Sequence, residues 1–161
     1  MTTKADYTAE EWELITRAPF MAAMAVVASS PSGPIGLVKE VFAVGGVLQE
    51  VSREGSSNEL ISALVADVNA GHRPAAPTES TEDVQEAKDL GLKTCRDVAA
   101  LLARKAPGPE AEGFKRWLLS TTQRVAEAAK EGGFLGIGGV RVSEAETTTL
   151  AELAGALGVT T

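Results

Sequence analysis

The sequence predicts an all-α protein, a compact bundle of about six or seven helices. Three observations support this prediction. Apolar residues recur at intervals of three and four along most of the chain, which places them on one face of a helix. Aromatic residues make up only 4% of the 161 residues, so the core must be built from Ala, Val, Leu and Ile. Alanine, a strong helix former, is abundant, and the alternating β-branched residues typical of strands are few.

A chain of this length is expected to fold as a single helical domain over residues 1–161. Its clearest irregular segment is 69–80, which is rich in glycine and proline. This segment divides the domain into two candidate halves, 8–70 and 80–158.

The first helix is expected to begin with a capping box at Thr8 and Glu11, in which each side chain accepts a hydrogen bond from the other residue's backbone amide. Pro19 lies inside the helical pattern and removes one backbone donor. It therefore predicts a kink or a break near residues 17–18. Residues 18–28 are apolar on every side of the helix, which predicts a central, buried position.

Two further helices are expected in the first half. One covers residues 35–53 and carries the pair Gly45-Gly46, which indicates close approach of another helix or a bend. The next is expected to be capped by Ser57 and to bury its apolar residues as far as Val68.

The second half opens with a long predicted helix. Ser80 or Thr81 is expected to cap it, and its apolar pattern continues to about Lys105. Gly91 lies inside this pattern and is a candidate break, because glycine weakens a helix interior.

The last two helices have clear start and stop signals. Pro109 opens the first of them, and Gly132-Gly133 ends it, since a left-handed C-terminal cap favours glycine. Ser143 and Glu146 form a second capping box, and Gly158 stops the final helix. The apolar side of this helix is expected to consist of Leu150, Leu153, Ala154 and Leu157.

The most unusual stretch joins these two helices. It interleaves glycines with apolar residues: Gly132, Gly133, Phe134, Leu135, Gly136, Ile137, Gly138 and Gly139. In the simplest interpretation the apolar side chains tuck into the bundle while the glycines allow positive φ. Alternatives are a small membrane-inserting tip and a phosphate cradle. As a phosphate cradle, the stretch lacks both the lysine of a P-loop and the glycine spacing of a dinucleotide-binding loop. The loop is therefore a candidate interaction element.

Glutamates near the predicted loops are candidate ligands of a divalent cation: Glu40, Glu127, Glu131 and Glu146. Hard cations prefer several carboxylate and carbonyl oxygens. Glu127 and Glu131 lie one turn apart and share a helix face. The spacing is not that of an EF-hand. A structural explanation also exists, with Glu127 on a solvated face and Glu146 at a helix N-terminus.

Composition narrows the classes of partner. The formal net charge of −7 disfavours nucleic acid and anionic membrane surfaces, which attract clustered Lys and Arg. The longest apolar run, 18–28, is too short to cross a bilayer, so no stable membrane insertion is expected. A single cysteine excludes a disulfide or a multi-thiolate zinc site within one chain. With no leader-like segment at the start, a cytoplasmic location is expected.

No catalytic set is recognisable in the sequence. His72, the single histidine, lies in the irregular segment. Cys95 falls on the apolar side of its helical pattern, where it is expected to pack as a small hydrophobe. Without a nucleophile–base pair at suitable spacing, the chain is not expected to be an enzyme.

A weak internal sequence similarity suggests that the chain arose by duplication. Trp12, Leu14 and Thr16 correspond to Trp117, Leu119 and Thr121, and each set opens a helix that leads to a glycine-containing loop. This similarity motivates the hypothesis of two helix–loop–helix units related by a pseudo-twofold axis.

A family resemblance is carried by residues 132–158, and in particular by Ser143, Glu146, Leu150, Leu153 and Leu157-Gly158. This stretch resembles the repeat unit of the tellurite-resistance TerB-like helical family. The resemblance implies an all-α domain with pseudo-twofold organisation and acidic residues that hold a metal. The loop aspartate of that family is replaced here by Gly132-Gly133 and Ser29-Ser30.

Three functional hypotheses follow, and a small-molecule-binding or hydrolytic enzyme in the bundle ranks last because the sequence offers no nucleophile–base pair for it. The first is a non-enzymatic cytoplasmic helical module without a cofactor, which self-associates or binds a protein partner through an apolar helix face or the glycine-rich loop. The alternative is a TerB-like, metal-responsive stress protein that uses the glutamates near the loops.

Overall fold

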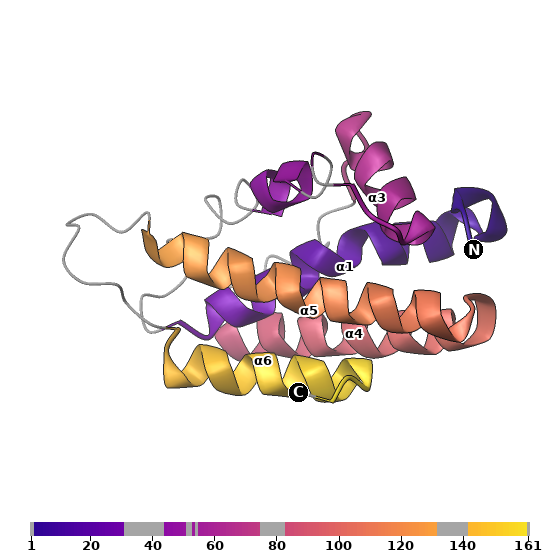
Figure 1. Cartoon of the computed structure of the whole chain (residues 1–161). Coiled ribbons are helices and arrows are strands. Elements are labelled where there is room, and N and C mark those ends of the chain that lie inside the picture. Colours follow the sequence, from indigo (N-terminus) through magenta and orange to yellow (C-terminus); the bar gives the residue numbers. More distant parts are fainter. Residues whose placement is uncertain are drawn as a thin grey trace.

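A computed structural model of the chain describes residues 2–30, 44–50, 53, 55–74, 83–131 and 142–160, and every regular element in these ranges is a helix (Figure 1). The elements are a short 3-10 helix η1 (Lys4–Asp6), α1 (Ala9–Ala28), α3 (Glu59–Asn69), α4 (Val84–Lys105), α5 (Gly108–Glu131) and α6 (Glu144–Leu157). Residues 44–50 are also helical. The predicted all-α fold is confirmed.

Helix α1 lies at the centre of the arrangement. It packs most extensively on α4 and also contacts α3, α5 and α6. Figure 1 shows α1, α4, α5 and α6 as long neighbouring helices, with α3 on the side away from α6. Residues 18–28, expected to be buried centrally, are buried at every position except the half-buried Phe20 and Met24. The candidate halves therefore interlock, because the first helix of one packs against the helices of the other.

Pro19 does not interrupt α1. The helix is continuous from Ala9 to Ala28 with the proline inside it, so the expected break near residues 17–18 is wrong, while the alternative of a kink there stays a prediction. Pro19 and its neighbour Ala18 are both buried. The physical reason is tertiary packing, because breaking the helix here would expose the apolar surface that α1 buries against the surrounding helices.

Gly91 marks a close helix crossing instead of a break. Helix α4 continues through it, and a Cβ added at Gly91 would lie 2.5 Å from the Ala25 Cβ and 2.8 Å from the Met21 carbonyl oxygen of α1. Only glycine allows the two backbones to approach so closely. Gly45 and Gly46, expected to mark such an approach or a bend, do not mark an approach to any described atom, since an added Cβ at either would meet nothing within 4 Å.

The predicted capping boxes are confirmed. Thr8 Oγ1 accepts from the Glu11 amide at 3.2 Å, and Glu11 Oε2 accepts from the Thr8 amide at 2.8 Å. Ser143 and Glu146 repeat this pattern at the start of α6. Gly158 ends α6 with φ 69°, the left-handed conformation expected of a C-terminal cap.

Two predicted caps are wrong by a few residues. Asn58, not Ser57, caps α3, because its side chain accepts from the Ile61 amide at 3.2 Å. Asp83 caps α4 by accepting from the Gln85 amide at 2.8 Å. Asn and Asp are at least as effective as Ser or Thr at this position, and the helices begin beside them. Residues 80 and 81, the expected caps of α4, lie outside the described residues.

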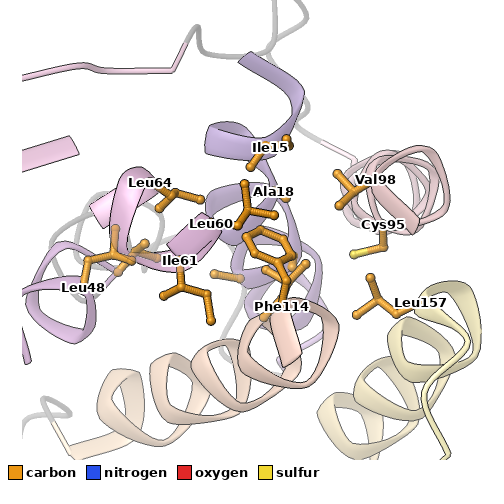
Figure 2. Close-up of a cluster of buried hydrophobic side chains, with 14 of the residues drawn as sticks. Ile15, Ala18, Leu48, Leu60, Ile61, Leu64, Cys95, Val98, Phe114 and Leu157 are labelled. Carbon is orange, nitrogen blue, oxygen red and sulfur yellow. The ribbon is translucent and has the colours of Figure 1, made fainter. Parts of the chain in front are cut away.

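The core is almost entirely aliphatic, as the composition predicted. Figure 2 shows Phe114 of α5 at its centre, with Leu60 and Leu64 of α3 on one side and Val98 of α4 on the other. All four side chains are fully buried. Leu48, from the helical segment 44–50, belongs to the same cluster, so the described part of that segment is attached to the bundle through apolar contacts.

Three helix ends meet at one end of the bundle. The C-terminus of α1, the C-terminus of α5 and the N-terminus of α6 lie together in Figure 1. The Ser29 hydroxyl, which caps α1, lies 2.7 Å from the Thr149 hydroxyl of α6. The described helix ends that flank residues 31–43 on one side and residues 132–141 on both sides therefore lie at the same end of the bundle. The pseudo-twofold relation stays a prediction.

Candidate functional site

The glycine-rich interaction element, Gly132 to Gly139 with Phe134, Leu135 and Ile137, lies outside the described residues. Its two flanks are described. Helix α5 ends at Glu131, and Val142 and Ser143 lead into α6. These flanks bring α5 and α6 together, and the candidate site is built on the surface between them.

A pocket of about 310 Å³ lies between α5 and α6. The α5–α6 pocket is lined by Leu119, Gln123, Val142, Thr147, Leu150 and Ala151. Its leucines and Val142 are half-buried, whereas Gln123, Thr147 and Ala151 are exposed. The pocket therefore offers an apolar floor with small or uncharged side chains at its edges.

The position at which α6 begins and the faces that α5 and α6 turn toward each other explain the lining of the pocket. The Ser143–Glu146 capping box fixes where α6 begins, and Thr147, Leu150 and Ala151 then fall on one face at intervals of three and four. On α5, Leu118 is fully buried in the core. Leu119, the next residue, lies beside the buried face of the helix and lines the pocket.

Acidic side chains lie near one end of the pocket. Glu127 follows Gln123 by one turn of α5, and Gln123 Nε2 donates to its Oε1 at 3.1 Å. Glu144 precedes Thr147 in the first turn of α6. Both glutamates are exposed. Arg124 of α5 forms an ion pair of 2.6 Å with Glu50, and this pairing partly neutralises the positive charge of Arg124.

The four candidate metal ligands have different outcomes. Glu40 and the side chain of Glu131 lie outside the described residues. Glu127 is exposed and hydrogen-bonded to Gln123. Glu146 is only 1% exposed, and its Oε2 accepts from the Ser143 amide at 2.8 Å and the Ser143 hydroxyl at 2.6 Å. The capping explanation therefore accounts for the geometry of Glu146.

Among the described residues, no three His, Cys, Asp or Glu side chains gather as a metal-binding group. The metal hypothesis stays a prediction, because the side chains of two of its four residues are not described. Its direct test is thermal unfolding with a chelator and then with calcium, magnesium, zinc or manganese. A ligand at about 100 times its dissociation constant adds about 2.7 kcal/mol of stability, so binding would produce a clear shift.

Cys95 packs as a small hydrophobe, as predicted. Its side chain is fully buried, and burial raises the pKa of the thiol to about 12. The thiolate is the reactive form of cysteine, so Cys95 is not a ready nucleophile. The ring nitrogens of His72 face the carboxylates of Glu13 and Asp67. The structure thus gives no support to a Cys95–His72 pair.

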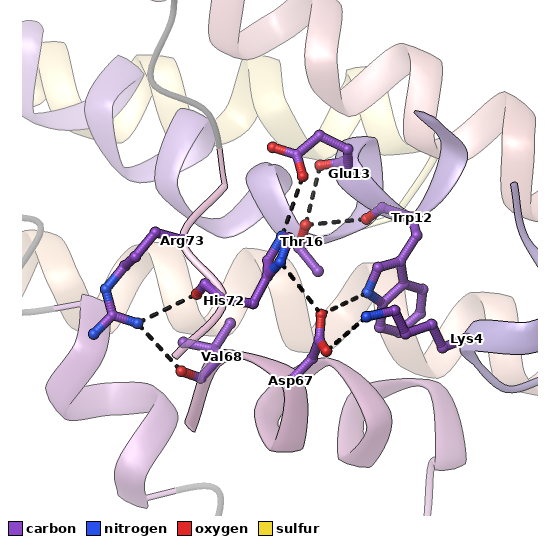
Figure 3. A network of polar contacts seen from close by, with 8 residues as sticks. All are labelled: Lys4, Trp12, Glu13, Thr16, Asp67, Val68, His72 and Arg73. Carbon is purple, nitrogen blue, oxygen red and sulfur yellow. Dashed lines mark hydrogen bonds and ion pairs between the residues drawn. The ribbon is translucent and has the colours of Figure 1, made fainter. Parts of the chain in front are cut away.

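A polar network joins η1, α1 and the end of α3 (Figure 3). Asp67 accepts from Lys4 Nζ and from Trp12 Nε1, each at 2.8 Å. His72 Nδ1 lies 3.8 Å from the same carboxylate, and its Nε2 lies 3.1 Å from Glu13 Oε2. Burial acts to raise the pKa of Asp67, but the donors Lys4 and Trp12 outweigh it and hold this pKa below its ordinary value.

The contacts of Asp67 tie η1 and α1 to the end of α3. The Thr16 hydroxyl, drawn beside the network in Figure 3, is fully buried and donates to the backbone carbonyls of Trp12 and Glu13. A nucleophile must reach its substrate, and this hydroxyl does not. Sequence reasoning missed the network because its members come from segments far apart in the chain. The single signal was the isolated His72.

Sequence reasoning also missed the α5–α6 pocket as a site. Leu150 was assigned to the apolar face of the last helix, and that much is correct, since it packs against the core while lining the pocket. A usable signal was Leu119, an apolar residue adjacent to the main buried stripe of α5.

Comparison of the chain with protein-family models, with curated proteins and with solved structures gave no match. In the described part of the chain, no helix combines the length and apolar character that crossing a bilayer requires.

Proposed function

We propose that this chain is a non-enzymatic, cytoplasmic helical module that acts by binding a protein partner in the α5–α6 pocket. The observation that carries the proposal is the pocket's apolar lining at the surface. Its apolar side chains Leu119, Val142 and Leu150 are half-buried and remain partly accessible to a partner. A pocket with an apolar floor and a few polar groups at its edge is typical of a binding site.

The shape and charge of the pocket favour a particular partner. It lies between two helices, and small or uncharged side chains edge it, so an apolar segment of a partner helix can approach closely. The chain carries a net charge of −7, and the exposed Glu127 and Glu144 lie near one end of the pocket. Basic residues beside the partner's apolar segment would complement this end.

Self-association is less favourable than binding of such a partner. Two copies that met through this pocket would bring two acidic surfaces together, and like charges at an interface disfavour association. The cytoplasmic location in the proposal is supported by the single cysteine, which leaves no disulfide within the chain.

Site-specific photocrosslinking in the cells that naturally make the protein tests the proposal. A photoreactive residue replaces Thr147 at the pocket edge or, as the control, Ala66 on the exposed side of α3. The proposal predicts a discrete heterologous adduct from the Thr147 position that is absent from the Ala66 position. Equal adducts from both positions, or an adduct only with a second copy of this chain, would contradict it.

A further inference from the structure

The start of the described chain is held by a buried carboxylate. Glu110, in the first turn of α5, is only 8% exposed, and so is Thr2. The Thr2 nitrogen lies 2.9 Å from Glu110 Oε1 and 3.0 Å from Oε2. The Thr2 hydroxyl donates to Oε2 at 2.9 Å. Both carboxylate oxygens are thus directed at one residue.

The surroundings of this carboxylate are built by three elements. Asn58, the cap of α3, donates from Nδ2 to the Glu110 carbonyl at 2.9 Å. The Tyr7 hydroxyl, at the end of η1, lies 3.0 Å from the Thr2 hydroxyl. Tyr7 itself is 7% exposed. The site is therefore preorganised and largely shielded from water.

A shielded carboxylate is costly unless a positive charge accompanies it. In the described part of the chain, the nearby cations have other partners. Lys105 pairs with Glu11 at 2.6 Å, and Lys115 pairs with Glu112. No lysine or arginine among the described residues forms an ion pair with Glu110.

The Thr2 nitrogen is within hydrogen-bond distance of both oxygens of Glu110. A peptide amide has one proton, which the two oxygens of Glu110 would have to share. An α-ammonium group has three protons and can donate a separate one to each oxygen. It also supplies the positive charge, because an α-amino group has an ordinary pKa of about 7.7–8.0 and is mostly protonated at neutral pH.

We propose that Thr2 is a processing site: a peptidase hydrolyses the Met1–Thr2 peptide bond, and the new α-ammonium of Thr2 forms a buried ion pair with Glu110. Hydrolysis adds one water across the bond. The carbonyl carbon of Met1 takes the oxygen and leaves as a carboxylate. The Thr2 nitrogen keeps its proton and gains two more, one from the water and one from the new carboxylic acid.

The proposal is tested by asking whether the effect of a Glu110 substitution on stability depends on removal of Met1. Site-specific cleavage of a fusion protein yields two full-length forms, one that begins at Thr2 and one in which Met1 follows an additional residue. Glu110→Gln is introduced into both, and thermal unfolding is followed by circular dichroism. The matched control is Glu112→Gln, since Glu112 lies in the same helix but is half-exposed and pairs with Lys115.

The proposal predicts that Glu110→Gln lowers the melting temperature by several degrees more in the form that begins at Thr2 than in the extended form. The control should shift both forms equally. Equal shifts for Glu110→Gln would overturn the ion pair. Independently, intact-mass analysis of the protein from its natural cells should give a chain that begins at Thr2. A chain that retains Met1, alone or after preceding residues, would overturn the processing.

Discussion

Replacement of Gly91 by alanine tests how closely α1 and α4 pack. In an unconstrained helix interior, this change stabilises by about 1 kcal/mol because alanine has the higher helix propensity. At Gly91 the new Cβ would lie 2.5 Å from the Ala25 Cβ and 2.8 Å from the Met21 carbonyl oxygen. Carbon atoms pack best at about 3.5–4.0 Å, so the helices would have to separate by about 1 Å.

The size of the effect follows from these opposing contributions. Overpacking in a core costs about 1–3 kcal/mol, and the upper end applies here because one of the contacting atoms belongs to the backbone. After the gain in helix propensity is subtracted, Gly91→Ala should destabilise the protein by about 2 kcal/mol. For a domain of this size, that corresponds to a melting temperature lower by about 4–8 °C.

Gly155→Ala is the matched control. Gly155 lies inside α6, is exposed, and an added Cβ would meet no described atom within 4 Å. This change should stabilise by up to about 1 kcal/mol. Urea unfolding followed by circular dichroism measures both variants. Removing the Ala25 Cβ with Ala25→Gly should make Gly91→Ala less damaging. If Gly91→Ala is as stable as Gly155→Ala, the close crossing of α1 and α4 does not exist.

Three further predictions concern burial and polar contacts. Because burial raises the pKa of Cys95 from 9.0 to about 12, a thiol reagent should label the unfolded chain and spare the folded one. Cys95 should stabilise the fold below pH 9, and this contribution should be lost as the pH rises toward about 12, so the urea midpoint should fall more steeply in the parent protein than in Cys95→Ala. Asp67→Ala should cost about 1–3 kcal/mol by leaving the Trp12 indole without its acceptor, and Asp67→Asn should cost less. Since the pKa of Asp67 is lowered from 3.8, its contribution should be present above that pH and disappear in stronger acid. Ser143→Ala should cost about 0.5–2 kcal/mol in thermal unfolding by removing the cap of α6, whereas an unchanged melting temperature would show that the cap does not form.

Local sequence signals predicted the helices well because the interactions that start and stop a helix are themselves local. The capping box at Thr8 needs only Glu11, three residues away. Gly158 ends α6 because a left-handed residue tolerates glycine best. The caps that were misplaced, at α3 and α4, differ from the predicted ones by a few residues within runs of several capping side chains.

Signals whose effect depends on distant residues could not be interpreted from the sequence. Pro19 and Gly91 both predict disruption when only their own helices are considered. In the fold, each lies where α1 packs against its neighbours, and the packing decides the outcome. The hydrogen bond from Trp12 to Asp67 likewise joins residues 55 positions apart, which no local pattern reveals.

The candidate site was predictable only in part. The apolar face of α6 was expected, and Leu150 belongs to it. The α5–α6 pocket also depends on how α5 lies against α6, and this placement brings Leu119 beside Leu150. Sequence reasoning placed the interaction element in the adjacent glycine-rich loop, whose residues lie outside the described structure. That part of the hypothesis stays a prediction.

The most direct test of the proposed function compares two matched substitutions in the photocrosslinking experiment. Ala151 lines the pocket and Ala66 lies on α3, and both are exposed helical alanines. Each is changed to glutamate in the protein that carries the photoreactive residue at position 147. The proposal predicts that Ala151→Glu abolishes the heterologous adduct while Ala66→Glu leaves its yield unchanged. An adduct that survives Ala151→Glu undiminished would contradict binding in the α5–α6 pocket.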